Sequence, residues 1–224
     1  MQAIVQPATA GAQGFDANTP ITRSKALAFK KAGFDFAVRY VTRKSSPPAH
    51  DLSQAEARAI LEAGLALMAV QHVAAPGWLA TPALGAAYGA NAANHAKLAG
   101  LPKGTALFLD LEEVSSKSSP ADVIGYCNSW YKAADAAGYA PGIYVGSNCG
   151  LSSAQLYYDL RFKYYWKSGS RVPAIPIRGY SMQQTIRPGD KVAGVAIDRN
   201  VVIPDRFGMA PPWARLGQAA ACRS

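Results

Sequence analysis

Short apolar segments alternate with longer amphipathic segments along most of this chain. The short segments have the composition of buried strands, whereas the long ones repeat apolar residues at helical spacing. The predicted strands are residues 14–16, 36–41, 65–73, 105–112, 141–146, 164–167, 179–184 and 192–198.

Helix start and stop signals lie between these predicted strands. Predicted starts are the cap-plus-proline sequences Asn18-Thr-Pro20, Thr81-Pro82 and Ser119-Pro120 and the capping box Ser53-Gln-Ala-Glu56. Predicted ends are Gly33, Gly64, Gly100 and Gly138, because glycine commonly follows the last helical turn.

Strand and helix alternate through the whole length, which predicts an α/β protein with a mainly parallel sheet. About eight strands favour a single closed TIM-like (β/α)8 barrel over an open doubly wound sheet. A Rossmann fold is disfavoured because Gly14-Phe-Asp-Ala-Asn18 lacks the phosphate-binding glycine spacing. The helical pattern weakens from Leu160 to Gly179, so we expect short or missing helices in the later units.

One domain accounts for the chain of 224 residues, which is 50% hydrophobic and 17% charged. We predict a flexible N-terminal segment at 1–13, the barrel at 14–210 and a C-terminal tail at 211–224.

The formal net charge of +9 favours anionic partners such as nucleic acid, acidic membranes or bacterial cell-wall polymers. Nucleic acid is disfavoured because no zinc-finger spacing, ribonucleoprotein motif or dense basic helix is present. We predict no integral membrane segment, and Met1–Pro7 lacks the basic and apolar parts of a signal peptide. We therefore expect synthesis in the cytoplasm and delivery to the cell wall by holin-type release or specialised secretion. An injected effector would have a secretion apparatus and an immunity protein as partners.

The three cysteines, Cys127, Cys149 and Cys222, have no metal-ligand spacing and are too few for a disulfide framework. We predict no metal site and no cofactor. The odd count fits a protein made in a reducing compartment, with Cys127 on a helix face and Cys222 on a loose tail.

Carboxylate side chains are the candidate catalytic groups of this sequence. Asp110 and Glu112 alternate with leucines at the end of one predicted strand, so both point to the same face. Their repulsion makes one of them keep its proton near neutral pH, as a general acid requires. Such a pair alone equally fits a solvated loop or a helix cap. Asp16 and Asp198 lie at two other predicted strand ends, and a barrel gathers these ends at one rim.

Four motifs in this order resemble glycoside hydrolase family 25 lysozymes and, more closely, their glycoside-hydrolase-like relatives catalogued as a domain of unknown function. The motifs are Gly14-Phe-Asp16, Phe108-Leu-Asp-Leu-Glu112, Gly142-Ile-Tyr144 and Ala196-Ile-Asp198. The relatives also share the strand Phe36-Ala-Val-Arg-Tyr40, and the resemblance covers about residues 14–203.

This resemblance implies a retaining muramidase that cleaves the β-1,4 bond between N-acetylmuramic acid and N-acetylglucosamine in peptidoglycan. It makes Glu112 the general acid and base and Asp110 the residue that orients and tunes it. Asp16 and Asp198 would stabilise the developing oxocarbenium ion. Whether an aspartate or the substrate's acetamido group attacks the sugar stays open.

Six further residues are candidates for substrate binding: Tyr144, Trp166, Gln183, His72, Tyr40 and Arg39. Aromatic faces suit sugar rings, and Gln183 and His72 can hydrogen-bond hydroxyl and acetamido groups. Tyr144, Trp166 and His72 equally fit positions in the core.

Two strands depart from the lysozyme pattern. This chain has Gln71-His72 where those enzymes carry Tyr-His, and Met182-Gln-Gln184 where they carry Trp-Gln-Tyr. The lost aromatics leave two alternatives open: a non-catalytic cell-wall glycan-binding module on the same barrel, or a glycosidase acting on another polysaccharide. The presence of Glu112 favours an enzyme.

Overall fold

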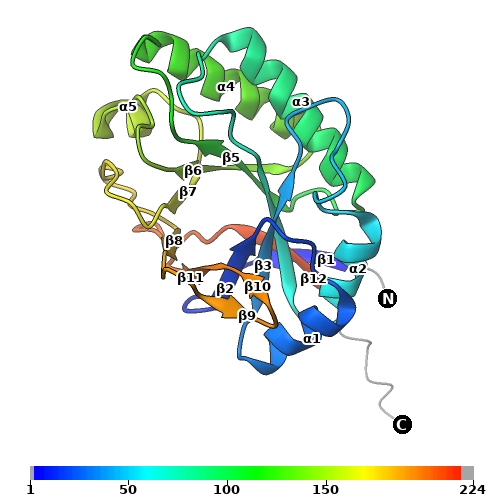
Figure 1. Ribbon diagram of the computed structural model, residues 1–224. Coiled ribbons are helices and arrows are strands. Elements are labelled where there is room, and N and C mark those ends of the chain that lie inside the picture. Colours follow the sequence, from blue (N-terminus) through cyan, green and yellow to red (C-terminus); the bar gives the residue numbers. More distant parts are fainter. Residues whose placement is uncertain (1–2, 218–224) are drawn as a thin grey trace.

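A closed barrel of eight strands forms the centre of the computed structural model, which describes residues 3–217 (Figure 1). In chain order its strands are β2 (Gln13–Ala17), β3 (Phe36–Val41), β4 (Ala66–Gln71), β5 (Ala106–Leu111), β6 (Ala140–Val145), β7 (Tyr164–Lys167), β8 (Met182–Thr185) and β11 (Asp198–Val202). Pairing of β4 with β5 closes the ring. The predicted TIM-like α/β barrel is confirmed.

The last barrel strand runs in the opposite direction from the other seven. β11 pairs antiparallel with both β2 and β8, whereas the remaining pairs are parallel. The connection at 186–197 holds only a small hairpin of β9 (Lys191–Val192) and β10 (Val195–Ala196). Without a crossover helix the chain re-enters the sheet at the rim it has just left, which requires an antiparallel strand. The predicted strand at 192–198 was therefore wrong in its bounds, because Asp198 begins the strand.

Helices cover the first half of the barrel. They are α1 (Arg23–Lys31), α2 (Gln54–Glu62), α3 (Pro82–Leu98), α4 (Pro120–Ala136) and the short α5 (Ser153–Tyr158). Neither the connection from β7 to β8 nor that from β8 to β11 contains a helix. In Figure 1 the yellow and orange strands accordingly lack the helical layer that α3 and α4 provide over β5. This confirms the expectation of short or missing helices in the later units.

Local sequence signals explain most of the helix ends. Ser53, Thr81 and Ser119 cap their helices through side-chain oxygens. The capping box predicted at Ser53 is only half formed, because the Glu56 carboxylate accepts hydrogen bonds from Ile21 and Arg39 instead. The predicted start of the first helix at 18–20 was wrong: α1 begins at Arg23, capped by Thr22. The four predicted glycine stops all have positive φ angles, between 78° and 91°.

The two ends of the described chain form a paired ribbon. β1 (Ala3–Pro7) pairs antiparallel with β12 (Pro212–Leu216), and β12 in turn contacts β4. The flexible segment predicted at 1–13 and the tail predicted at 211–224 therefore contain strands, while residues 218–224, including Cys222, lie outside the described residues. Both strands are short, and only their mutual pairing makes them recognisable. Buried Trp213 of β12 packs near Phe36 inside the barrel, with ring centroids 5.8 Å apart.

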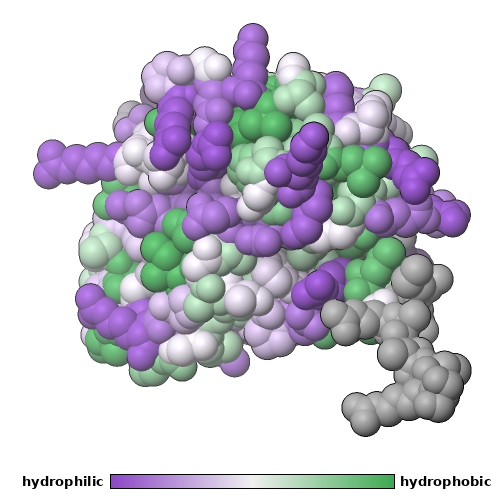
Figure 2. All heavy atoms as spheres, turned by 90° about the horizontal axis from the view of Figure 1, so that it is seen from below, coloured by the Kyte–Doolittle hydropathy of each residue, from purple (hydrophilic) through white to green (hydrophobic). Residues whose placement is uncertain are grey.

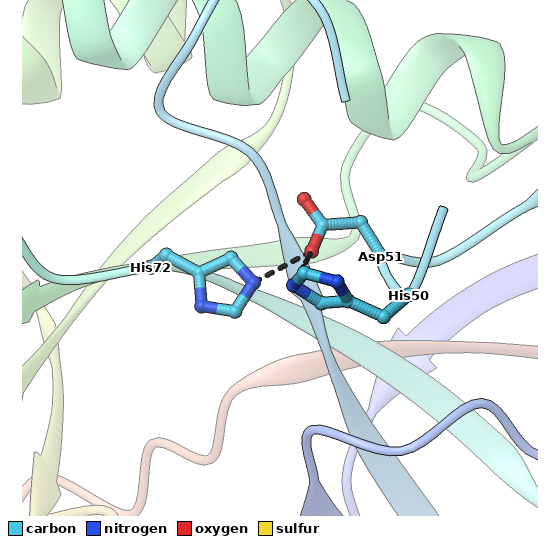
Figure 3. A group of neighbouring side chains, drawn as sticks. All are labelled: His50, Asp51 and His72. Atoms are coloured by element: carbon cyan, nitrogen blue, oxygen red, sulfur yellow. Dashed lines mark hydrogen bonds and ion pairs between the residues drawn. The ribbon is translucent and has the colours of Figure 1, made fainter. Parts of the chain in front are cut away.

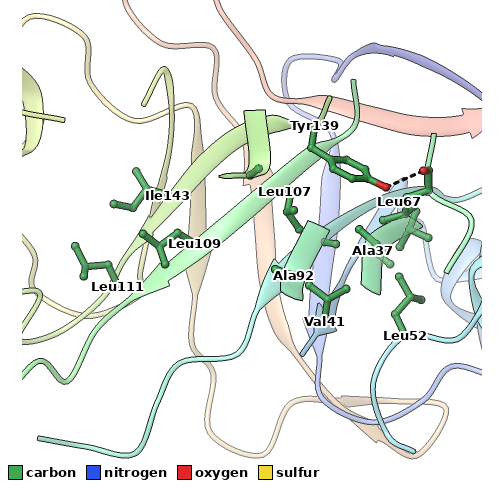
Figure 4. Packing of buried hydrophobic residues seen from close by; sticks show 14 of the residues in the cluster. Ala37, Val41, Leu52, Leu67, Ala92, Leu107, Leu109, Leu111, Tyr139 and Ile143 are labelled. Atoms are coloured by element: carbon green, nitrogen blue, oxygen red, sulfur yellow. Dashed lines mark hydrogen bonds between the residues drawn. The ribbon is translucent and has the colours of Figure 1, made fainter. Parts of the chain in front are cut away.

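Alternation along each strand separates two hydrophobic cores. Outward-facing residues such as Val41, Leu67 and Leu109 pack between the barrel and its helices (Figure 4). Inward-facing aromatics such as Phe108 fill the barrel interior. A Cβ at Gly142 would overlap the Phe108 ring, so glycine on the neighbouring strand makes room for that side chain. The interior is thereby packed up to the carboxyl ends of the parallel strands.

One face of the molecule carries many exposed polar side chains (Figure 2). Figure 2 shows long hydrophilic side chains projecting between separate hydrophobic patches on the face seen from below. None of the described helices combines the length and apolar character that a bilayer crossing requires.

Candidate active site

A pocket of about 200 Å³ opens where the parallel barrel strands end. Its lining consists of Tyr40, Val70, Asp110, Glu112, Tyr144, Trp166, Ser170, Gln184, Ile186 and Asp198. Tyr40, Asp110, Tyr144, Gln184 and Asp198 lie on five different barrel strands, and Glu112 directly follows one of them, so the barrel rim brings together polar side chains that are far apart in the sequence.

Asp110 and Glu112 enter this pocket together. Leu109 and Leu111 point to the outer core, so alternation turns Asp110 inward, and Glu112 follows directly after the last residue of β5. Both carboxylates line the pocket, as the spacing predicted.

Asp110 is the more buried of the two carboxylates, with 5% of the residue exposed. Burial is the largest cause that raises its pKa well above the usual range, and repulsion from Glu112 and Asp16 adds to it. A backbone hydrogen bond from Val73 acts in the opposite direction. Within residues 3–217, its Oδ1 atom is a buried oxygen without a hydrogen-bond partner. Asp110 therefore holds its proton to higher pH than an ordinary aspartic acid does.

Glu112 is half-buried, and burial followed by repulsion from Glu113 raises its pKa. Gly146, directly after β6, provides the space for its side chain. A Cβ at this position would overlap both the carboxylate and the stem of Glu112. Glu112 thus combines access to the pocket with a proton that is held to higher pH than usual.

Asp16 lies buried at the base of the site, 3% exposed. Its Oδ2 atom accepts hydrogen bonds from Gln184 Nε2 at 2.9 Å and Asn200 Nδ2 at 2.8 Å. The hydroxyl of Tyr40 lies 3.4 Å from its Oδ1 atom. Burial raises the pKa of Asp16 to about 6 against the opposing effect of these donors, and Asp198 adds a smaller repulsion. At neutral pH Asp16 is therefore a buried negative charge below the pocket.

Asp198 completes the predicted acid set. It lies opposite Asp16 in the pairing of β11 with β2 and is half-buried in the pocket wall. Burial and repulsion from Asp190 raise its pKa. All four predicted carboxylates thus meet at one end of the barrel.

The three predicted aromatic residues, Tyr40, Tyr144 and Trp166, all line the pocket. Trp166 packs edge to face against Tyr144, with ring centroids 4.7 Å apart, and is 1% exposed. The Tyr144 hydroxyl donates to Gln184 Oε1 at 3.0 Å. Such close packing leaves Trp166 little free face for a sugar ring. Its main role is to hold the neighbouring side chains Tyr144 and Asn200 in place.

Gln184, and not the predicted Gln183, projects into the pocket. Met182 and Gln184 face the barrel interior, so alternation turns Gln183 to the outer face of β8. The prediction chose the wrong one of two adjacent glutamines because the register of this short strand is not visible in the sequence.

Arg39 also lies away from the pocket. It projects outward from β3, is fully buried, and forms an ion pair with Glu56 in which Nε and Oε1 are 2.6 Å apart. Its guanidinium also donates to the carbonyl oxygens of Ala17 and His50. The predicted place of Arg39 among the substrate-binding residues is thus not supported, since these contacts occupy its side chain between sheet and helices.

His72 lies beside the pocket and not in its lining. Its ring stacks on Tyr40, with centroids 4.6 Å apart, and its Nε2 atom lies 2.6 Å from Asp51 Oδ1. It faces a neighbouring pocket of about 360 Å³, to which His50 also contributes.

Sequence reasoning missed Asn200, Gln184, His50 and Asp51. Asn200 lies two residues after Asp198, and recognising β11 as a strand that begins at Asp198 would have placed it on the same face. His50 and Asp51 lie in a long loop that carries no periodic signal.

A carboxylate-lined pocket at the carboxyl ends of an eight-stranded barrel is the arrangement of a glycoside hydrolase-like domain. The chain belongs to the family described as the Rv2525c-like, glycoside hydrolase-like domain, which matches residues 27–202. The resemblance expected from the sequence is thereby confirmed. No relative is found among curated proteins.

Several solved structures share the fold. The Tat-secreted protein Rv2525c of Mycobacterium tuberculosis has a TM-score of 0.64 and 18% identity, covering 90% of this chain and 99% of its own. The catalytic domain of endolysin ply40 from Listeria monocytogenes bacteriophage P40 has a TM-score of 0.59 and 18% identity, covering 87% and 94%. The lysozyme of Streptomyces coelicolor has a TM-score of 0.56 and 19% identity, covering 87% and 93%.

Proposed function

We propose that this protein is a muramidase that cleaves the β-1,4 bond from N-acetylmuramic acid to N-acetylglucosamine in peptidoglycan. The observation that carries this proposal is the meeting of Asp16, Asp110, Glu112 and Asp198 at one barrel rim, three of them in the pocket lining. Lysozyme-like relatives with the same fold support the choice of a glycosidase. The net charge of +9 suits an anionic cell wall.

Glu112 is the general acid and base in this mechanism. Its raised pKa and its access to the pocket support donation of a proton to the leaving glycosidic oxygen, followed by activation of water. Asp110, whose pKa burial raises well above the usual range, adds no second charge beside Glu112 while it holds its proton, and it can then orient Glu112 by hydrogen bonding.

Asp16 and Asp198 stabilise the positive charge that develops on the sugar. We assign Asp16 an electrostatic role because it is buried and its carboxylate already has hydrogen bonds to three side chains. A carboxylate held in this way is a poor nucleophile. We therefore propose that the acetamido group of the substrate attacks the anomeric carbon, a route that also retains the configuration.

The proposed place of action is the cell wall.

Incubation of the purified protein with purified peptidoglycan tests the function. The proposal predicts new reducing ends, and mass spectrometry should find N-acetylmuramic acid at those ends. Cleavage on the other side of this sugar would change the enzyme class, and activity confined to non-wall glycans in a parallel survey would identify another glycosidase. Absence of products from all of these polymers would overturn the enzymatic proposal.

A glycan-binding module without turnover is the second candidate. Three positions lack the lysozyme aromatics and offer no aromatic stacking surface. Met182 is fully buried, Gln71 accepts a hydrogen bond from buried Trp130 at 2.7 Å, and Gln184 donates to Asp16 at 2.9 Å. This candidate predicts saturable co-sedimentation with insoluble peptidoglycan and an unchanged set of wall fragments. Release of fragments by the wild-type protein would exclude it.

A further inference from the structure

A second group of polar side chains lies on the same rim, next to the carboxylate pocket. His50 and Asp51 belong to the loop between β3 and α2, and His72 follows the last residue of β4. Figure 3 shows the two imidazole rings converging on the Asp51 carboxylate. Parallel pairing of β3 with β4 brings these two parts of the chain together.

The three side chains present one ligand atom each to a common point. Nε2 of His72 lies 2.6 Å, and Nε2 of His50 3.6 Å, from Oδ1 of Asp51. All three atoms lie within 4.8 Å of one another. Metal ions of the first transition row bind such atoms at about 2.0 to 2.2 Å, so a small adjustment would place one ion between them.

Asp51 lacks full compensation of its charge. Its side chain is completely buried, and the ion-pair partners found for it among residues 3–217 are all histidines. Its Oδ2 atom is buried without a hydrogen-bond partner in this part of the chain. Nδ1 of His95 lies 3.9 Å from this atom and already accepts a hydrogen bond from the Thr42 amide at 2.9 Å. A buried carboxylate in this state favours a cation.

We propose that His50, Asp51 and His72 bind a divalent transition-metal ion, with Zn²⁺ as the best match. Imidazole nitrogen and carboxylate oxygen are usual zinc ligands, whereas Ca²⁺ and Mg²⁺ prefer all-oxygen sites. Three protein ligands leave one tetrahedral position open. His50 and His72 line the neighbouring pocket of about 360 Å³, which would have room for a water molecule or a ligand group at that position.

Surrounding contacts hold the ligands in place. The His72 ring stacks on Tyr40 with an interplanar angle of 24°. Buried Arg39 donates from Nη2 to the His50 carbonyl oxygen at 2.9 Å, and the Leu52 amide donates to the Tyr40 carbonyl oxygen at 3.0 Å. Both halves of the site are therefore held by contacts with β3, and the contacts of Arg39 help to position His50. Supporting shells of this kind orient metal ligands.

Two cations, Arg43 and Lys44, line the same pocket. They oppose a metal ion by charge repulsion, and they would favour an anionic group as its fourth ligand. Lys44 therefore offers a matched control, because removal of its charge should not weaken a metal site, whereas it should weaken a site for anions.

Calorimetric titration of untagged, chelator-treated full-length protein with ZnCl2 tests this proposal. We expect one ion per chain, and His50→Gln and His72→Gln should each weaken binding at least about tenfold. Lys44→Gln should bind Zn²⁺ equally or more tightly. His50 is exposed, so His50→Gln should retain the fold, which circular dichroism checks.

Titration with CoCl2 identifies the ligand atoms. Nitrogen and oxygen ligands predict visible d–d bands of a four-coordinate ion without the thiolate charge-transfer band that cysteine ligands produce. Zinc binding that is absent, that survives both histidine substitutions, or that carries the thiolate band would overturn the proposal.

Discussion

Asn200 donates its side-chain amide to Asp16, with Nδ2 and Oδ2 2.8 Å apart, where the last barrel strand meets the first. The Oδ1 atom of Asn200 accepts the indole N–H of Trp166 at 2.8 Å, which fixes the orientation of the amide. The antiparallel direction of β11 thus connects the barrel interior to the buried acid of the site.

Substitution of Asn200 by Ala should destabilise the protein by about 1 to 3 kcal/mol, because it leaves the buried indole N–H of Trp166 without its acceptor. Urea denaturation measures this loss. Asn128→Ala is the control, because the hydrogen bonds of Asn128 are exposed and its loss should cost less. Equal losses in the two variants would contradict the role of Asn200.

Asp16 should make stability fall as pH rises. The pKa of Asp16 is about 6 in the folded protein, whereas the ordinary value for an aspartate side chain is 3.8. The folded state therefore binds the proton more tightly than the unfolded state does. The stabilising contribution of Asp16 is complete below about pH 4 and is lost as pH rises through about 6, by up to about 3 kcal/mol. Urea denaturation at several pH values, compared with Asp16→Asn, isolates this contribution. The stability difference between wild type and variant should change with pH in this window, and a constant difference would contradict the buried charge.

Glu113 should set the pH range of activity through Glu112. A general acid is active while it holds its proton, so activity should decline as pH rises through the raised pKa of Glu112. Glu113→Gln removes a repulsive charge that raises this pKa, and the alkaline limb should move to lower pH. Glu62→Gln, exposed on α2, should leave the profile unchanged. A shift to higher pH in Glu113→Gln would be inconsistent with this electrostatic relationship.

Arg39 should matter for stability and for the loop that carries His50. Arg39→Met leaves the buried carboxylate of Glu56 unpaired and should cost about 3 to 5 kcal/mol, measured by chemical denaturation. The double variant Arg39→Met, Glu56→Gln should recover part of this loss, since no unpaired charge remains. Full stability of the single variant, with impaired glycan binding, would return Arg39 to the predicted substrate-binding set.

The sequence allowed the barrel and the four acids to be predicted because both follow from local patterns. Periodicity reveals strands and helices, and barrel topology brings strand ends to one rim. Alternation also separates Arg39 from Tyr40, although the prediction placed both in the substrate-binding set. The direction of β11 and the choice between Gln183 and Gln184 depend on pairing and register, which only long-range contacts fix. For the same reason the pairing of β1 with β12 was missed.

Reducing-end release from purified peptidoglycan by wild type, Glu112→Gln and Glu113→Gln tests the central claim most directly. Loss of a general acid should lower the turnover rate by a factor of about 10² to 10⁴ in Glu112→Gln. Glu113→Gln, which makes the same charge change one residue away, should retain activity at acidic pH. Equal turnover by Glu112→Gln and wild type would contradict the assignment of Glu112 and the hydrolase mechanism built on it.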